Sequence, residues 1–299
     1  MTPGAKSLCA FAVKRGDLKK RIDVHYNLPG LIRDAYSSCS QKIAQADSLL
    51  HGMSGYIHKV LDLDEMEDKK TIFFAAARGN LLHTRMDPEY HRPFYAHRIH
   101  EIEKTPYDTL GNIVEFSNET WNQKDYFDSV FPYIEISGVR LRENVYETVA
   151  TPLKEAPSRA KMIVRRGDII VSATRPHRGA IATITCPDGE MEIASTGFCV
   201  LRRLKREDVS KEYLQWILLD DYVLLQMLRR ISGGNYPAIT ADELKKIVIP
   251  IPDPALQKKI CDEAARRKNA VKVLRDEAAR EWQEAKTQFE KDLFGGQKK

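Results

Sequence analysis

Apolar residues recur at helical spacing in two stretches, one near each end of the chain. The first lies between Pro29-Gly30 and the glycines Gly52 and Gly55, and its apolar members are Leu31, Ile32, Ala35, Tyr36, Cys39, Ile43, Ala46, Leu49 and Leu50. The second runs from 254 to 294 and contains no glycine, and no proline after its first residue. Spacing of three to four residues places such side chains on one face of a helix. The sequence therefore predicts a helix in each stretch.

The second of these helices is long for a globular protein. At about 1.5 Å per residue, some 40 residues reach about 60 Å. Its apolar positions form a stripe that requires a partner helix. The stripe comprises Leu256, Ile260, Val271, Leu274, Ala278, Trp282, Ala285, Phe289 and Leu293.

Between the two helices the pattern changes to short β-rich runs separated by turns. β-branched runs such as Ile247-Val248-Ile249 suit buried strands, and Pro250 and Pro252 end that run. One helix, from Ser210 through Leu228, interrupts the strands. The sequence thus predicts an α+β fold in three parts: an N-terminal helical segment (1–70), a mixed β-rich domain (71–252) and a long C-terminal helix (253–299).

Composition narrows the function only modestly. The 299 residues are 42% hydrophobic and 30% charged, without a run of the roughly 20 apolar residues that a membrane span needs. The five cysteines are scattered and odd in number, which favours the cytoplasm and argues against disulfides or a zinc knuckle. A net charge of +5 is compatible with a polyanionic partner.

Motifs that would carry catalysis are absent from the sequence. There is no phosphate-binding Gly-x-x-x-x-Gly-Lys-Ser/Thr loop and no His-Glu-x-x-His pair. Asn235-Tyr236-Pro237-Ala238 only superficially matches the Asn-Pro-Pro-Tyr motif of amino-methyltransferases. His91, His97 and His100 lie close together in sequence, but no cysteine or carboxylate completes a plausible metal site. We expect no catalytic residue, metal or cofactor in this chain.

Apolar runs and glycine-proline turns follow one another in a distinctive order between residues 132 and 260. They are Pro132–Ile136, Arg159–Ser172 with its Gly167-Asp168 turn, Gly179–Ile184, Ala194–Arg202, Gly233–Thr240, Ile247–Pro252 and Gln257–Ile260. Their order and spacing resemble the target-recognition domain of DNA specificity (S) subunits from Type I restriction-modification systems. The resemblance covers roughly residues 85 to 295, and it implies a strand at Ala194–Arg202.

This resemblance implies a non-catalytic subunit for phage defence. Its β-rich domain would recognise double-stranded DNA, and its long helix would act as a coiled-coil spacer. The partners it implies are a methyltransferase (M) subunit, which binds S-adenosylmethionine and methylates adenine N6, and in some systems a restriction and translocase (R) subunit.

The chain departs from the family pattern in size. A full-length S subunit carries two recognition domains and two long helices, whereas only one complete domain is evident here. The phrase Arg-x-Asp-x-x-Tyr-x-x-Pro occurs twice, at 21–29 and 85–93, either as a repeated lead-in to such a domain or by chance. A half-sized or truncated subunit would pair with itself through antiparallel long helices. The interface residues we expect are Ile260, Val271, Leu274, Trp282 and Phe289.

Sequence recognition in the major groove requires Arg donors for guanine and Asn or Gln for adenine, and phosphates require further cations. Five segments have suitable side chains, each with a structural alternative. A stiffened turn or hairpin tip carries Arg175, His177 and Arg178. A glycine loop, whose alternative role is helix capping, carries Asn235 and Tyr236 after Arg229 and Arg230. Trp121, Asn122 and Lys124 form the third segment, with Trp121 alternatively in the core. Arg165 and Arg166, or the basic run 202–206, are candidates for phosphate contacts, or ordinary charged strand ends.

Three other functions stay open. The chain could be a regulatory S-like subunit that binds methyltransferase without forming a working enzyme. It could also recognise DNA for another kind of phage-defence complex. Finally, an enzyme could use the histidine cluster on a small substrate.

Overall fold

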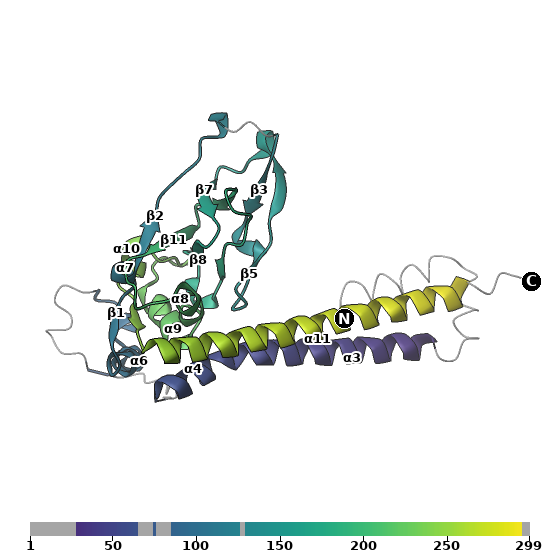
Figure 1. Ribbon diagram of the computed structural model, residues 1–299, viewed down its shortest axis with the longest axis horizontal. Helices are drawn as coiled ribbons and strands as arrows, with labels where there is room; N and C mark the ends of the chain where they lie inside the picture. Colours follow the sequence, from purple (N-terminus) through teal and green to yellow (C-terminus); the bar gives the residue numbers. More distant parts are fainter. Residues whose placement is uncertain (1–27, 65–73, 76–84, 126–128, 295–299) are drawn as a thin grey trace, which may run out of the picture. The chain divides into compact units, whose positions relative to one another are not determined.

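The computed structural model of the chain describes residues 28–64, 74–75, 85–125 and 129–294 (Figure 1). These residues form two compact units. One unit comprises 28–50 and 266–294, and the other comprises the described residues between 51 and 265. Residues 21–27 of the first repeated phrase lie outside the described residues. The units group segments by contact rather than by order, so the three-part division along the sequence stays a prediction.

The larger unit contains both short strands and helices. Its helices are α4 (Met53–Leu61), α6 (Pro93–Glu103), α7 (Leu110–Ile113), α8 (Lys211–Ile217), α9 (Asp221–Arg230), α10 (Ala241–Lys245) and the first part of α11 (Pro254–Phe294). Short 3-10 turns are η1 (Glu89–His91), η2 (Gln123–Asp125), η3 (Ile136–Gly138), η4 (Leu153–Glu155) and η5 (Pro176–Arg178).

Two four-stranded sheets form the centre of this unit. The first has the order β2-β11-β8-β9 and is antiparallel throughout, with bounds Val114–Ser117, Phe198–Leu204, Ile169–Ser172 and Ile181–Thr183. The second has the order β6-β3-β10-β7, with bounds Val149–Pro152, Val130–Ile134, Met191–Ser195 and Ala160–Arg165, and only its β3–β10 pair is parallel. Two antiparallel pairs complete the strands: β1 (Tyr107–Thr109) with β12 (Val248–Pro250), and β4 (Val139–Arg140) with β5 (Val145–Tyr146).

Alternation along the strands places apolar residues on both faces of both sheets. In β8, Ile169 and Val171 face the helices, whereas Ile170 packs between the sheets. In β10, Ala194 lies between the sheets and Ile193 lies on the far face of the second sheet. Side chains of successive strand residues point to opposite faces, so this pattern produces three layers: helices, first sheet and second sheet.

The smaller unit is an antiparallel pair formed by α3 (Leu28–His51) and the second part of α11. Its apolar seam joins Ala46 and Leu50 to Val271, with Leu49 and Leu274 packed beside them. Nearer the other end of the pair, Tyr36 meets Trp282 edge to face at 6.4 Å. Lys42–Glu277 (3.3 Å) and Arg275–Asp47 (2.9 Å) ion pairs flank the seam. The stripe of the long helix therefore has a partner helix in the same chain.

These contacts bear on the five residues expected at a homodimer interface. Ile260 is fully buried in the core of the larger unit. Val271, Leu274 and Trp282 contact α3, as described above. Phe289 is half-buried near the end of α11. Dimerisation stays a prediction, but Ile260, Val271, Leu274 and Trp282 already have partners within the chain.

The α+β class, the β-rich centre and the long C-terminal helix predicted from the sequence are confirmed. Asp253 caps α11 by accepting from the amides of Ala255 (2.9 Å) and Leu256 (3.0 Å), with Pro254 in the first turn. Three local predictions are wrong. Gly55 does not end a helix but lies inside α4, segment 194–202 contains a turn between β10 and β11, and segment 210–228 is two helices.

The two breaks have physical causes. Asp220 accepts a hydrogen bond from the amide of Tyr222 at 2.9 Å and so caps a new helix, α9. At the β10–β11 turn, a Cβ on Gly197 would lie 2.6 Å from Ile136 Cδ1. Glycine keeps the turn clear of the end of the Ile136 side chain, and the Ser195 hydroxyl stabilises the turn by accepting from the amide of Gly197 at 3.2 Å.

Candidate nucleic-acid interface

Two loops predicted separately from the sequence lie against each other in the structure. Thr174 and Ala238 form an isolated antiparallel bridge. Next to it, the amide of Arg175 donates to Pro237 O at 2.9 Å, and the amide of Ile239 donates to Ala173 O at 2.9 Å. Segments 174–178 and 232–238 therefore form one surface, which we call the paired-loop surface.

The backbone of the first loop is held in an unusual shape. Arg175 has φ 48° and ψ 51°, and Gly179 has φ 79°, so both ends of η5 are left-handed. This region is uncommon for a residue with a side chain. The Arg175 guanidinium also donates to Asn235 O, at 3.3 Å, in the second loop. The main chain and a side chain together fix how the two loops meet.

Polar and aromatic side chains of the paired-loop surface are exposed to solvent. Arg175, Arg178, Asn235 and Tyr236 are all exposed, and Tyr236 is 80% accessible despite its size. Guanidinium, carboxamide and phenol groups supply the donors, acceptors and apolar surface that contact base edges and phosphates. The paired-loop surface can therefore contact base edges and phosphates, as the sequence predicted for each loop separately.

The His177 side chain is half-buried, in contrast to these exposed side chains. Burial, followed by the charges of Arg178, Arg175 and Arg142, lowers the pKa of its imidazole below the usual value. The ring therefore favours its neutral form at neutral pH, in which it can both donate and accept. It borders a cavity of about 420 Å³ whose lining includes Arg142, Asp221 and Tyr222.

Arg229 and Arg230 precede the second loop but point to partners elsewhere in the unit. Arg229 Nε donates to Tyr90 O at 2.7 Å, and its guanidinium lies 4.1 Å from the centre of the Tyr90 ring. Arg230 pairs with Glu243 at 3.0 Å, with a side chain only 11% exposed. These contacts support a structural role for both arginines, and the structure leaves their proposed DNA contacts untested.

The Trp121 segment is divided between core and surface. Trp121 donates from Nε1 to Ala160 O at 2.6 Å and packs 4.6 Å from the ring of Phe131. Asn122 and Lys124 are exposed. They lie beside an open groove of about 730 Å³, which is lined by Gln123, Lys124, Ser129, Val130, Pro152, Leu153, Lys154 and Glu155. Trp121 is thus an anchor, and Asn122 and Lys124 stay candidates for a second contact.

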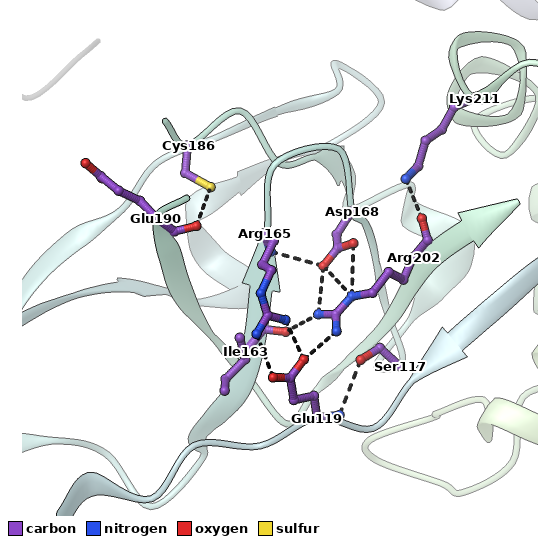
Figure 2. A network of polar contacts seen from close by, with 9 residues as sticks. All are labelled: Ser117, Glu119, Ile163, Arg165, Asp168, Cys186, Glu190, Arg202 and Lys211. Carbon is purple, nitrogen blue, oxygen red and sulfur yellow. Dashed lines mark hydrogen bonds and ion pairs between the residues drawn. The ribbon is translucent and has the colours of Figure 1, made fainter. Parts of the chain in front are cut away.

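Arg165 belongs to an ion-pair network that Figure 2 shows, together with Arg202, Glu119 and Asp168. Asp168 is almost fully buried and accepts from Arg202 Nη2 (3.0 Å) and from the amide of Arg165 (3.0 Å). Glu119 accepts from both guanidiniums, and these hydrogen bonds, those of Arg165 first, lower its pKa to about 2. We call these four residues the arginine clasp.

The arginine clasp joins the two sheets. Arg165 ends β7 of the second sheet, Arg202 lies in β11 of the first sheet, and Glu119 follows β2. The guanidiniums are neutralised by carboxylates, which leaves them poor ligands for phosphate. Arg166, in contrast, is 58% exposed, pairs with the exposed Asp188 at 3.3 Å and donates to Cys186 O at 3.3 Å. Of the two arginines predicted before Gly167, Arg166 is the more available.

Arg142 is a residue of this region that the sequence interpretation missed. It has φ 62°, donates from its amide to Gly179 O at 2.8 Å and pairs with Asp221 at 2.6 Å. The only sequence signal is the polar run Arg142-Glu143-Asn144. That run predicts a turn, but it does not show which loop the turn contacts.

Two further observations concern the described residues alone. Among them, no group of three or more His, Cys, Asp or Glu side chains is arranged to hold a metal ion. None of the helices within the described ranges is long and apolar enough to cross a membrane.

Comparison with known proteins decides the family. The family described as "Type I restriction modification DNA specificity domain" matches residues 106–263, more than half of the chain. The chain belongs to this family. The match includes both loops of the paired-loop surface, the arginine clasp and the start of α11, and it confirms the resemblance found in the sequence.

Individual relatives are similar over part of their length. The specificity subunit of the Type I restriction enzyme HindI from Haemophilus influenzae is 28% identical over 145 residues, which are 47% of this chain and 28% of that protein. The crystal structure of the HsdS subunit from Thermoanaerobacter tengcongensis is 30% identical with a TM-score of 0.48, over 58% of this chain and 45% of that one. The S subunit from M. genitalium is 14% identical with a TM-score of 0.47, over 90% of this chain and 61% of that one. The chain thus spans less than two thirds of the length of these relatives.

Proposed function

We propose that the chain is a non-catalytic DNA specificity subunit of a Type I restriction-modification complex, and that its paired-loop surface contacts the bases of a short half-site. One observation carries the proposal. Two loops chosen separately for their side chains, 174–178 and 232–238, are joined by backbone hydrogen bonds and present exposed Arg178, Asn235 and Tyr236 together. Membership of a DNA specificity family indicates that the target is DNA.

The partners follow from the same proposal. The specificity subunit would bind double-stranded DNA and dock M subunits, which bind S-adenosylmethionine and methylate adenine N6 in the cytoplasm. An R subunit would join where restriction accompanies modification. The chain itself would need no cofactor, since the family relatives are named for specificity rather than for a chemical step.

Selection from a library of random-sequence DNA duplexes tests recognition directly. The wild-type chain should enrich a short common motif at moderate salt, where non-specific phosphate binding is weakened. The variant Arg178→Ala, Tyr236→Ala should enrich it poorly or not at all. A matched control, Arg140→Ala, removes another exposed arginine, whose partner is Glu147 at 2.8 Å, and should enrich the wild-type motif.

Enrichment of the same motif by the double variant would refute the paired-loop surface as the recognition site. Failure of the wild-type chain to enrich any motif would refute recognition by this chain alone. Co-expression with an M subunit, followed by mapping of methylated adenines, then separates a working subunit from a regulatory one. A regulatory S-like chain would bind M without producing methylation.

We also propose that a half-sized chain associates with a second copy. The exposed apolar residues Ile43 (46% accessible) and Val273 (55% accessible) on α3 and α11 support this proposal. Charged residues at Val271 or Leu274 would disturb the pair within the chain, so Val273→Glu is the cleaner variant. Light scattering should show a dimeric wild type and a monomeric variant. A monomeric wild type would refute self-association.

A further inference from the structure

We propose that Arg175 and Arg142 are positioning residues, which clamp the turn 175–179 from two sides so that Arg178 and Tyr236 are presented in fixed geometry. The inference rests on the proposed function of the paired-loop surface. It divides the arginines around this surface into two kinds: those that hold the turn and one that contacts DNA.

Arg175 clamps the turn to the second loop. Its amide donates to Pro237 O at 2.9 Å, and its guanidinium donates to Asn235 O at 3.3 Å. Both acceptors are main-chain carbonyls, so the contacts fix the path of the loop without using the Asn235 side chain. That carboxamide and the neighbouring Tyr236 ring stay free to face a ligand.

Arg142 clamps the opposite end of the turn. Its amide donates to Gly179 O at 2.8 Å, and its guanidinium pairs with Asp221 at the start of α9, at 2.6 Å. A Cβ on Gly179 would lie 2.8 Å from Arg142 Cγ, which shows how closely the side chain covers the turn. The turn is thereby tied to a helix of the core.

Both clamping residues have left-handed backbone conformations, with φ 48° at Arg175 and φ 62° at Arg142. Glycine adopts this region without steric cost, whereas arginine rarely does. Non-glycine residues in such conformations cluster at functional sites, where surrounding contacts hold them. Arginine at both positions indicates that the side-chain contacts are needed there.

Arg178 differs from both. Its backbone amide donates to Arg175 O at 3.0 Å within the turn, but among the described residues its guanidinium forms no hydrogen bond or ion pair. It is exposed, and its position follows from the two clamps. Arg178 is therefore the arginine of the turn that is available for a base edge or a phosphate.

The first test measures amide hydrogen exchange in the free protein. Arg175→Gly tolerates φ 48° but lacks the guanidinium, and should speed exchange at Ala238, whose amide donates to Ser232 O, by about tenfold or more. Arg175→Lys keeps a cation but loses the planar fork and should exchange faster than wild type, although less so than the glycine variant. Arg178→Ala should leave exchange at Ala238 unchanged. Unchanged exchange in Arg175→Gly would overturn the clamp.

The second test measures DNA binding at several salt concentrations, using the duplex enriched by the wild-type chain. Arg175→Gly should weaken specific binding about tenfold with no change in the salt dependence, because no phosphate contact is lost. Arg142→Ala should weaken specific binding to a similar extent, also without a change in the salt dependence. Arg142→Lys can still pair with Asp221 and should recover most of the affinity. A salt slope that falls by about one in Arg175→Gly would instead identify Arg175 as a phosphate contact.

The two tests separate the inference from the proposed function. Should the wild-type chain enrich no duplex, the proposed function fails, while hydrogen exchange still decides whether Arg175 and Arg142 hold the turn. Should the duplex be bound but exchange at Ala238 stay as slow in Arg175→Gly as in the wild type, the proposed function stands and the clamp is wrong.

Discussion

The paired-loop surface and the arginine clasp are both rich in arginine, yet they use it in opposite ways. In the clasp, Arg165 and Arg202 are neutralised by Glu119 and Asp168 (Figure 2). On the paired-loop surface, Arg178 and Arg175 are exposed, and the Arg175 guanidinium donates to a main-chain carbonyl oxygen. The availability of an arginine is therefore set by which carboxylates the fold brings to it, and not by its neighbours in sequence.

Removal of Asp168 should have the largest effect and should affect stability alone. Asp168→Ala leaves the Arg202 guanidinium with one carboxylate fewer, in a site where the lost acid is almost fully buried. We expect a loss of about 3 kcal/mol in the free energy of unfolding, by the cost of breaking a buried ion pair. Urea denaturation measures it.

Asp188→Ala is the matched control for that experiment. Its carboxylate is 88% exposed and pairs with Arg166 at 3.3 Å. Exposed pairs contribute about 0–1 kcal/mol, so the control should unfold nearly as wild type does. If Asp168→Ala were as stable as the control, the clasp would not be the structural element described here.

Arg178→Ala should instead weaken DNA recognition and leave the free energy of unfolding unchanged. Loss of a good arginine–base contact costs about 1–3 kcal/mol in discrimination. Titration of the enriched duplex and of single-base variants would show weaker specificity at one position. Equal discrimination by the variant and the wild type would place base contact elsewhere, with Asn122 and Lys124 as the next candidates.

Tyr236→Phe and Tyr236→Ala separate the contributions of the Tyr236 ring and hydroxyl to DNA binding. An exposed aromatic ring that packs on a thymine methyl would contribute about 1 kcal/mol, roughly as one hydrogen bond does. Retention of affinity in the phenylalanine variant alone would assign the contact to the ring. Loss in both would assign it to the hydroxyl, and no loss in either would remove Tyr236 from the interface.

The smallest effect concerns the response of the clasp to acid. The pKa of Glu119 is about 2 in the folded chain and about 4.3 for an ordinary glutamate. A lowered folded pKa adds stability above the unfolded value, and this contribution is lost as pH falls from about 4.5 to 2. Because Glu119 is 39% exposed, we expect only about 1 kcal/mol.

Glu119→Gln measures that contribution. The variant should be slightly less stable than wild type at pH 7, and the difference should shrink as the pH is lowered through this window. Denaturation of both proteins at several pH values between 7 and 2 gives the two curves. Parallel curves would show that Glu119 does not titrate as a member of the clasp.

Local structure was largely predictable from the sequence, since its signals are local. The helix at 254–294 begins where Asp253 and Pro254 indicate, and β8, β9 and β12 lie in the predicted apolar runs. The break at Asp220 was not predicted. This aspartate is both a helix cap and the partner of His58, at 3.0 Å, and the histidine lies far away in sequence.

The candidate site was predictable only in pieces. Composition selected the loops around Arg175 and Asn235, but their meeting depends on the non-local bridge between Thr174 and Ala238. The structural role of Arg229 was not predictable for the same reason, because its partner Tyr90 is 139 residues away. Arg142 shows the converse case, in which nothing in its own segment points to the turn that it covers.

Site-specific photocrosslinking tests the central claim most directly. A photoreactive phenylalanine derivative placed at Tyr236, at the exposed end of the paired-loop surface, should crosslink to the enriched duplex within its common motif. The same residue placed at Val273, which is 55% accessible on the helical pair, should not crosslink to the motif when DNA is the only partner. Crosslinking from Val273 within the motif, with none from Tyr236, would contradict recognition by the paired-loop surface.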